Sequence, residues 1–296
     1  MQLSANGLSI EVDDQGPASG PPLLLIMGLG MQLTGWPDGL VNLLVGRGFR
    51  VIRIDNRDAG LSQGFEAAGT PNLAWATLRY LLHLSVPAAY GLADMAKDSF
   101  GALDALGIDK VQVCGASMGG MIAQHMAASQ PDRVSRLTLV MTSSGARSLP
   151  QPSMKVRSAL LERRPAGALD VDAEVARLMR LFTLIGSPGY RPDPADFKAR
   201  LRASVQRAWR PSGVARQLVA VAADGDRTPL LARISAPTHI VHGADDPLVP
   251  VAAARDLQAR ISRSTLEIIE GMGHDLPAQL WPRLAQAIAG PTPASS

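Results

Sequence analysis

VQVCGASMGGMIAQ, residues 111–124, is the stretch that decides the fold. The apolar run at 111–114 is typical of a buried strand and the residues after Ser117 are typical of a helix, so the serine stands at the bend between them. A turn this tight forces Ser117 into a strained backbone conformation, and Gly115 and Gly119 leave room where a side chain would collide with neighbouring backbone. The bend exposes the hydroxyl at a helix start, where free N–H groups face developing negative charge. We therefore predict that Ser117 is a nucleophile.

A nucleophilic serine needs a base, and the chain has five histidines. His83 precedes the serine, whereas the histidine follows it in this strand–serine–helix architecture. His125 lies farther along the same helix, roughly 12 Å away at 1.5 Å rise per residue. His239 and His242 stand at odd separation in a predicted strand, so they point to opposite faces, which also argues against a shared metal site. His274, in a glycine-rich loop directly after an alternating strand, is the predicted base.

The base in turn needs a carboxylate that holds its tautomer. The segment VHGADDP, residues 241–247, follows the end of the preceding predicted strand and offers Asp245 and Asp246. We favour Asp246, because the proline after it fixes an extended backbone and a turn just past the strand end. Asp245 is the alternative.

The Ser117 turn, the Asp246 turn and the Gly273-His274 loop, in this order, resemble the α/β-hydrolase superfamily. They are most similar to lid-bearing bacterial esterases of the aclacinomycin methylesterase and cofactor-free perhydrolase kind. The resemblance implies a serine hydrolase in which Ser117, Asp246 and His274 form a catalytic triad. Such an enzyme cleaves carboxylic esters of small, largely apolar molecules through an acyl-enzyme intermediate. It needs no metal, nucleotide or flavin.

Acyl transfer also requires hydrogen-bond donors for the oxyanion. One predicted donor is the backbone N–H of Met118, at the helix start, and the other should come from the loop at residues 27–30. By match to the His-Gly turn of the family, Leu29 would donate its backbone N–H. Met27 stands where the family has its histidine, so the side chain that usually braces this loop is absent.

A second turn also departs from the family pattern at one position. Residues 55–62, DNRDAGLS, resemble the Asp-x-Arg-Gly-x-Gly-x-Ser turn of the superfamily, with Asp58 where glycine is usual. We interpret Asp55 and Arg57 as scaffold residues that tie this loop beside the site. The connection at residues 63–90 is long and is a candidate for part of the entrance.

Strand and helix patterns alternate along most of the chain, which predicts the α/β class with a mostly parallel central sheet and helices on both faces. Residues 8–12 alternate as an antiparallel edge strand would. Between Gly145 and about Arg233 the alternation stops and helical patterns take over. We therefore predict an α/β-hydrolase core at 1–144 and 234–296 with an inserted helical lid at 145–233.

Large apolar side chains that follow the early strand or lie in the predicted lid are candidates for a substrate wall, although packing on the core and on one another explains most of those in the lid. The candidates are Trp36, Met154, Leu160, Leu161, Met179, Phe182 and Trp209.

Charge is divided unevenly along the chain. Residues 145–216 hold 14 Lys and Arg against 6 Asp and Glu, while the remainder holds 15 against 20. A basic lid over an acidic body would steer anionic substrates, although arginines on solvent faces of helices explain the same numbers. No motif indicates a nucleic-acid partner, so the sequence pI of 9.3 is no argument for one.

The remaining composition fits a cytoplasmic protein. There is one cysteine, no apolar run of membrane-spanning length and no N-terminal secretory pattern. We interpret Cys114 as a packing residue. The sequence does not indicate an oligomeric state.

Other functions share these residues. Perhydrolases and haloperoxidases use the same triad with peroxide as the acceptor, and carbon–carbon hydrolases use it as well. From a different class, a small-ligand receptor with slow turnover also fits, and turnover of simple esters separates it from an esterase.

Overall fold

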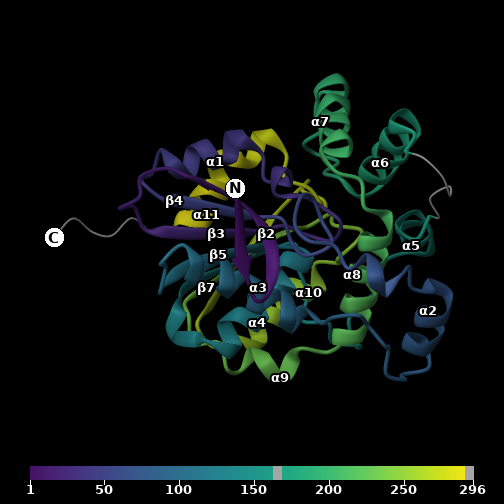
Figure 1. The fold of residues 1–296 in the computed structure, drawn as a ribbon, viewed down its shortest axis with the longest axis horizontal. Helices are drawn as coiled ribbons and strands as arrows, with labels where there is room; N and C mark the ends of the chain where they lie inside the picture. Colours follow the sequence, from purple (N-terminus) through teal and green to yellow (C-terminus); the bar gives the residue numbers. More distant parts are fainter. Residues whose placement is uncertain (163–168, 291–296) are drawn as a thin grey trace.

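The structure, a computed structural model, describes residues 1–162 and 169–290. Residues 163–168 of the predicted lid and 291–296 of the predicted core lie outside that range. Its centre is an eight-stranded sheet in the order β1-β2-β4-β3-β5-β6-β7-β8 (Figure 1). The strands are Gln2–Ala5 (β1), Leu8–Gln15 (β2), Pro22–Ile26 (β3), Arg50–Ile54 (β4), Val111–Ala116 (β5), Val134–Val140 (β6), Thr238–Gly243 (β7) and Ser264–Ile269 (β8).

Every strand pair from β4 to β8 is parallel, and β1 and β2 join the sheet antiparallel. The predicted mostly parallel α/β sheet is therefore confirmed. The expectation that residues 8–12 form an edge strand is wrong, because β1 pairs outside β2. Asn6 and Gly7, with φ of 50° and 75°, form the tight turn between them, and Asn-Gly is the favoured pair for such a hairpin turn.

Helices cover both faces of the sheet (Figure 1). Helices α1 (Asp38–Val45) and α11 (Trp281–Ala289) contribute to one buried apolar cluster. The opposite cluster includes α3 (Leu92–Ala105), α4 (Met118–Ser129) and α10 (Ala252–Arg260). Because both faces are covered, the central strands are apolar along their length rather than alternating.

The described part of residues 145–233 is helical, with no strand. Its helices are α5 (Met154–Leu160), α6 (Val171–Ile185), α7 (Pro194–Arg207), α8 (Pro211–Asp224) and α9 (Thr228–Leu231). Helices α5, α6 and α7 stand beside the sheet (Figure 1), where α6 and α7 share a small apolar cluster around Val175 and Leu201. Helices α8 and α9 pack on core helices. We call residues 145–233 the insertion; that it acts as a lid stays a prediction.

The long connection at 63–90 is less open than the sequence suggests. It contains helix α2 (Leu73–Leu81), which packs against α8 through a cluster of Ala76, Val86 and Val219. The insertion therefore contacts the core chain on this side as well.

Candidate active site

Ser117 occupies the sharp bend between β5 and α4, with φ of 56° and ψ of −122°. Few residues other than glycine adopt a positive φ, and the strain that it costs is typical of functional sites. The steric prediction for the neighbouring glycines is confirmed. A Cβ on Gly115 would lie 2.2 Å from the Gly119 carbonyl oxygen, and one on Gly119 would lie 2.1 Å from the Ile26 oxygen.

His274 and Asp246 meet Ser117 in a single chain of hydrogen bonds. The Ser117 Oγ lies 3.0 Å from the His274 Nε2, and the His274 Nδ1 lies 2.7 Å from the Asp246 Oδ2. A carboxylate can only accept, so Nδ1 carries the proton and Nε2 is left to accept from the serine hydroxyl. Asp245 points elsewhere, because its Oδ2 accepts the Gly271 N–H at 2.9 Å. The structure therefore brings Asp246, and not Asp245, onto the histidine.

A second histidine lies behind the carboxylate. His242 is fully buried, and its Nε2 donates to the Val249 carbonyl at 2.7 Å and lies 3.7 Å from the Asp246 Oδ2. Burial lowers the pKa of His242, so the ring is held neutral next to the acid. We did not predict from the sequence that His242 lies beside Asp246, although the two residues are only four positions apart. His239, on the opposite face of β7, contacts Glu267 instead.

The loop that carries His274 is held by the insertion. The His274 backbone N–H donates to the Ile185 carbonyl at 2.7 Å, at the end of α6. The Ser187 hydroxyl accepts the Gly273 N–H at 2.9 Å and donates to the Asp275 carboxylate. These contacts join segments almost ninety residues apart, and no sequence motif indicated them.

The two predicted oxyanion donors both lie next to Ser117. Met118 follows it in the chain, and a Cβ on Gly28 would lie 3.0 Å from the Ser117 Cβ, so the loop with Leu29 presses against the nucleophile. Within the described residues, neither the Leu29 nor the Met118 backbone N–H donates a hydrogen bond to a protein group. That these two N–H groups bind a substrate oxygen stays a prediction.

The loop has Met27 where the family has a histidine, and two side-chain amides hold the loop instead. Asn56 donates from its Nδ2 to the Met27 carbonyl at 2.9 Å. Gln217, from α8 of the insertion, accepts the Gly30 N–H at 2.8 Å. No sequence motif indicated either contact.

Two of the predicted pocket residues lie at opposite extremes of exposure. Trp36 has no exposed surface and packs in the apolar cluster under α1 and α11. Met154, at the start of α5, is 69% exposed.

The other candidates are spread over the insertion. Met179 and Phe182 pack against the cluster between α6 and α7, where the Phe182 ring meets Phe197 edge-on at 5.5 Å. Leu160 is half-buried and Leu161 is exposed, at the end of α5. None of these side chains has a described contact with the triad, so their substrate role stays a prediction.

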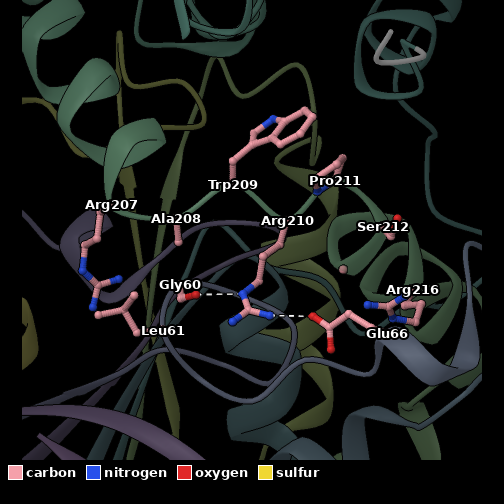
Figure 2. A pocket seen from close by; sticks show the side chains of 11 residues that line it. Gly60, Leu61, Glu66, Arg207, Ala208, Trp209, Arg210, Pro211, Ser212 and Arg216 are labelled. Atoms are coloured by element: carbon pink, nitrogen blue, oxygen red, sulfur yellow. Dashed lines mark hydrogen bonds and ion pairs between the residues drawn. The ribbon is translucent and has the colours of Figure 1, made fainter. Parts of the chain in front are cut away.

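Trp209 lines a pocket of about 450 Å³ between the α7–α8 connection and the loop at residues 60–66, and neither Ser117 nor His274 lines it. Figure 2 shows Arg207 and Arg210 extending toward the core loop, with the Trp209 ring directed the other way. Arg210 pairs with Glu66 at 2.7 Å. Trp209 therefore lines a pocket whose walls do not include the nucleophile, and its place in a substrate wall stays a prediction.

The arginines of this pocket anchor the insertion to the core. Arg207 pairs with the buried Asp55 at 2.7 Å, and Arg216 contacts both oxygens of Asp58 at 2.7 Å. Asp58 also accepts from the Tyr90 hydroxyl at 2.7 Å. Burial raises the pKa of Asp58, but these donors together outweigh it and hold the pKa below its usual value. Part of the basic charge of the insertion therefore neutralises core carboxylates instead of facing a substrate.

Across residues 1–162 and 169–290, no cluster of three or more His, Cys, Asp or Glu side chains is arranged to hold a metal ion. In the same ranges no helix combines the length and apolar character needed to cross a membrane.

Comparison with known proteins shows to which family the chain belongs. A family model described as the alpha/beta hydrolase fold matches residues 21–278. Rhodomycin D methylesterase DauP from Streptomyces sp. (strain C5) is 29% identical, over 95% of this chain and 94% of its own. A 2-hydroxy-6-oxononadienedioate/2-hydroxy-6-oxononatrienedioate hydrolase from Klebsiella pneumoniae is 30% identical, over 90% and 85%.

The fold is also that of a solved enzyme structure. The meta-cleavage product hydrolase from Pseudomonas fluorescens IP01 superposes with a TM-score of 0.73 at 20% identity, over 97% of this chain and 94% of the other. Fold, family model and relatives agree with one another, and they confirm the resemblance found in the sequence. The chain belongs to the α/β-hydrolase fold family, as a hydrolase of the esterase type.

Proposed function

We propose that this protein hydrolyses carboxylic esters of small, largely apolar molecules through an acyl-enzyme on Ser117. The observation that carries the proposal is the chain of hydrogen bonds from the Ser117 hydroxyl to His274 at 3.0 Å and from His274 to Asp246 at 2.7 Å. A serine hydroxyl is a weak nucleophile on its own, and a base held in the correct tautomer activates it.

In the first step the Ser117 oxygen attacks the ester carbonyl and His274 takes its proton. The carbonyl oxygen becomes an oxyanion, which the backbone N–H groups of Leu29 and Met118 stabilise. The carbon–oxygen bond to the alcohol then breaks, and His274 returns the proton to the leaving alcohol. Asp246 stabilises the imidazolium throughout.

In the second step a water molecule replaces the alcohol. His274 removes a proton from the water as the water attacks the acyl carbonyl, and the same N–H groups stabilise the second oxyanion. Breaking the bond to Ser117 releases the acid, and the serine recovers its proton from His274. The step balances with water as the only co-reactant.

The substrate class rests on the relatives and on the insertion. Two relatives are named methylesterases, which supports an ester as the substrate. Met179 and Phe182 are half-buried apolar side chains of the insertion, and they are the candidates for contact with an apolar acyl or alcohol group.

Steady-state hydrolysis of p-nitrophenyl acetate and p-nitrophenyl butyrate tests the proposal. Turnover by the wild-type protein and its loss in Ser117→Ala and in His274→Ala are expected. Tight binding of esters without turnover would instead indicate a receptor. Adding peroxide and acetate, and assaying peracid, tests the perhydrolase alternative in the same preparation.

A further inference from the structure

The loop that carries one predicted oxyanion donor is a single tight turn. The Met31 N–H donates to the Gly28 carbonyl at 3.1 Å, which makes Leu29 and Gly30 the two central residues. Gly30 has a φ of 66°, the value that a type II turn requires at its third residue. Turns of this kind interconvert with other types when the central peptide rotates, so the peptide between Leu29 and Gly30 needs a fixed orientation.

Gln217 fixes this peptide from outside the core. Its Oε1 accepts the Gly30 N–H at 2.8 Å, and its Nε2 donates to the Arg57 carbonyl at 2.7 Å. Only an oxygen can accept from the N–H and only the NH₂ can donate to the carbonyl, so the amide has one orientation. The side chain is fully buried, so water does not compete for either partner.

Helix α8 is itself held in place beside this contact. Arg216, the preceding residue, contacts both carboxylate oxygens of Asp58, which is also buried. Val214 lies against Gly30, where an added Cβ would meet its Cγ2 at 2.8 Å. The position of the Gln217 amide is therefore determined by packing and by an ion pair, as a positioning contact requires.

We propose that Gln217 is a positioning residue for the oxyanion hole, so that α8 of the insertion completes the acyl-transfer site. The inference rests on the proposed function. Gln217 holds the Leu29–Gly30 peptide, and the Leu29 N–H belongs to the peptide before it. The contact therefore acts on this donor through the backbone conformation of Leu29, which sets how the turn lies beside Ser117. Since an oxyanion forms only in the transition state, loss of the contact affects turnover and leaves substrate binding nearly unchanged.

The variant Gln217→Met removes both hydrogen bonds and keeps the side-chain volume. We expect kcat for p-nitrophenyl butyrate to fall about 10- to 100-fold, below the roughly 10²- to 10³-fold cost of losing an oxyanion donor outright, with KM within about twofold. A trifluoromethyl ketone, which forms a tetrahedral adduct with serine, should bind more weakly by the same factor. Gln217→Asn keeps an amide but is too short to reach Gly30, and it is measured alongside in case the methionine variant does not fold.

Gln124→Met is the matched control. Gln124 is equally buried and also bonds across elements, donating to the Ser143 carbonyl and accepting from Arg227, but it does not touch the turn. Its loss should lower thermal stability and leave kcat within about threefold. The three glutamine variants are therefore separated by kcat and inhibitor affinity rather than by stability.

Unchanged kcat and unchanged inhibitor affinity in folded Gln217 variants would overturn this inference while leaving the proposed function intact. An equal loss of kcat in Gln124→Met would overturn it too, because general destabilisation would then explain the effect. Wild-type protein that turns over no ester, or Ser117→Ala with wild-type activity, would instead overturn the proposed function, and this inference with it.

Discussion

Asp246 contacts His274 through one carboxylate oxygen and holds its own position through the other. The Oδ2 accepts from the His274 Nδ1 at 2.7 Å, while the Oδ1 accepts the backbone N–H groups of Leu248 and Val249 at 2.9 and 2.8 Å. The acid is therefore oriented by the turn that follows β7 before it meets the histidine.

This relationship predicts different results for two adjacent acids. Asp246→Asn should lower kcat by about 10³- to 10⁴-fold, because an amide does not stabilise the imidazolium and favours the wrong tautomer. Asp245→Asn should stay within about threefold, since its side-chain oxygen still accepts from Gly271. Steady-state kinetics with p-nitrophenyl butyrate compares them, and the reverse order would assign the acid to Asp245.

The buried His242 ring should make the free energy of unfolding depend on pH. Burial depresses the pKa of His242 in the folded protein, while in the unfolded chain the pKa stays near the ordinary histidine value of 6.5. Below that pH the unfolded state binds more protons, so the free energy of unfolding falls as pH drops toward the folded-state pKa. The slope from one such group is at most about 1.4 kcal/mol per pH unit.

Urea denaturation at pH 7 and pH 5 measures this effect. The variant His242→Gln should lose less stability between the two pH values than the wild-type protein does. Equal losses in both proteins would show that other groups account for the acid sensitivity.

Removing either Arg216 or Asp58 alone should destabilise the protein more than the loss of their attraction would, because the remaining charge stays buried. Both side chains are buried, so Arg216→Met or Asp58→Asn alone should cost about 3–5 kcal/mol by leaving the other charge without its partner. The double variant should cost less than the sum of the two. Denaturant melts of the four proteins give the coupling energy.

The exposed pair between Arg202 and Asp172 is the control for that cycle, with side chains 37% and 77% exposed. Arg202→Met should cost less than about 1 kcal/mol. Additive effects of the two substitutions at the buried pair would contradict the proposed anchoring.

Cys114 should be inert although it lies three residues before the nucleophile. The thiol is completely buried in β5, and burial raises its pKa, so little thiolate forms at neutral pH. Native protein treated with dithiobis(nitrobenzoate) at pH 8 should keep full esterase activity. It should release no thionitrobenzoate until the protein is unfolded. Rapid reaction of the native protein would show that the strand opens.

The sequence predicts the parts of the site that depend on local geometry. The bend at Ser117 needs glycines two residues away on each side, and that requirement is visible in the chain itself. Asp246 and His274 each come shortly after the end of a strand, and apolar runs followed by turn residues show where those strands end. Parallel strands bring such ends to one edge of the sheet. The prediction that residues 8–12 form the edge strand was wrong, because it overlooked the Asn6-Gly7 turn, which joins β1 to β2.

Contacts between distant segments could not be predicted in this way. Asp58 stands where the family has glycine, and only the structure pairs it with Arg216, 158 residues later. The same holds for Gln217 and Gly30, and for Ser187 and the loop of His274. Each pairing depends on how the insertion packs on the core, and a hydrophobic pattern reports burial without reporting the partner.

Mapping the covalent intermediate tests the central claim most directly. Wild-type protein is mixed with p-nitrophenyl butyrate, quenched in acid within the first turnover and digested with trypsin, which releases residues 111–133 as one peptide. Mass spectrometry should find a butyryl group on Ser117 in that peptide, and none in Ser117→Ala. A butyryl group on another residue, or full activity without Ser117, would contradict the mechanism.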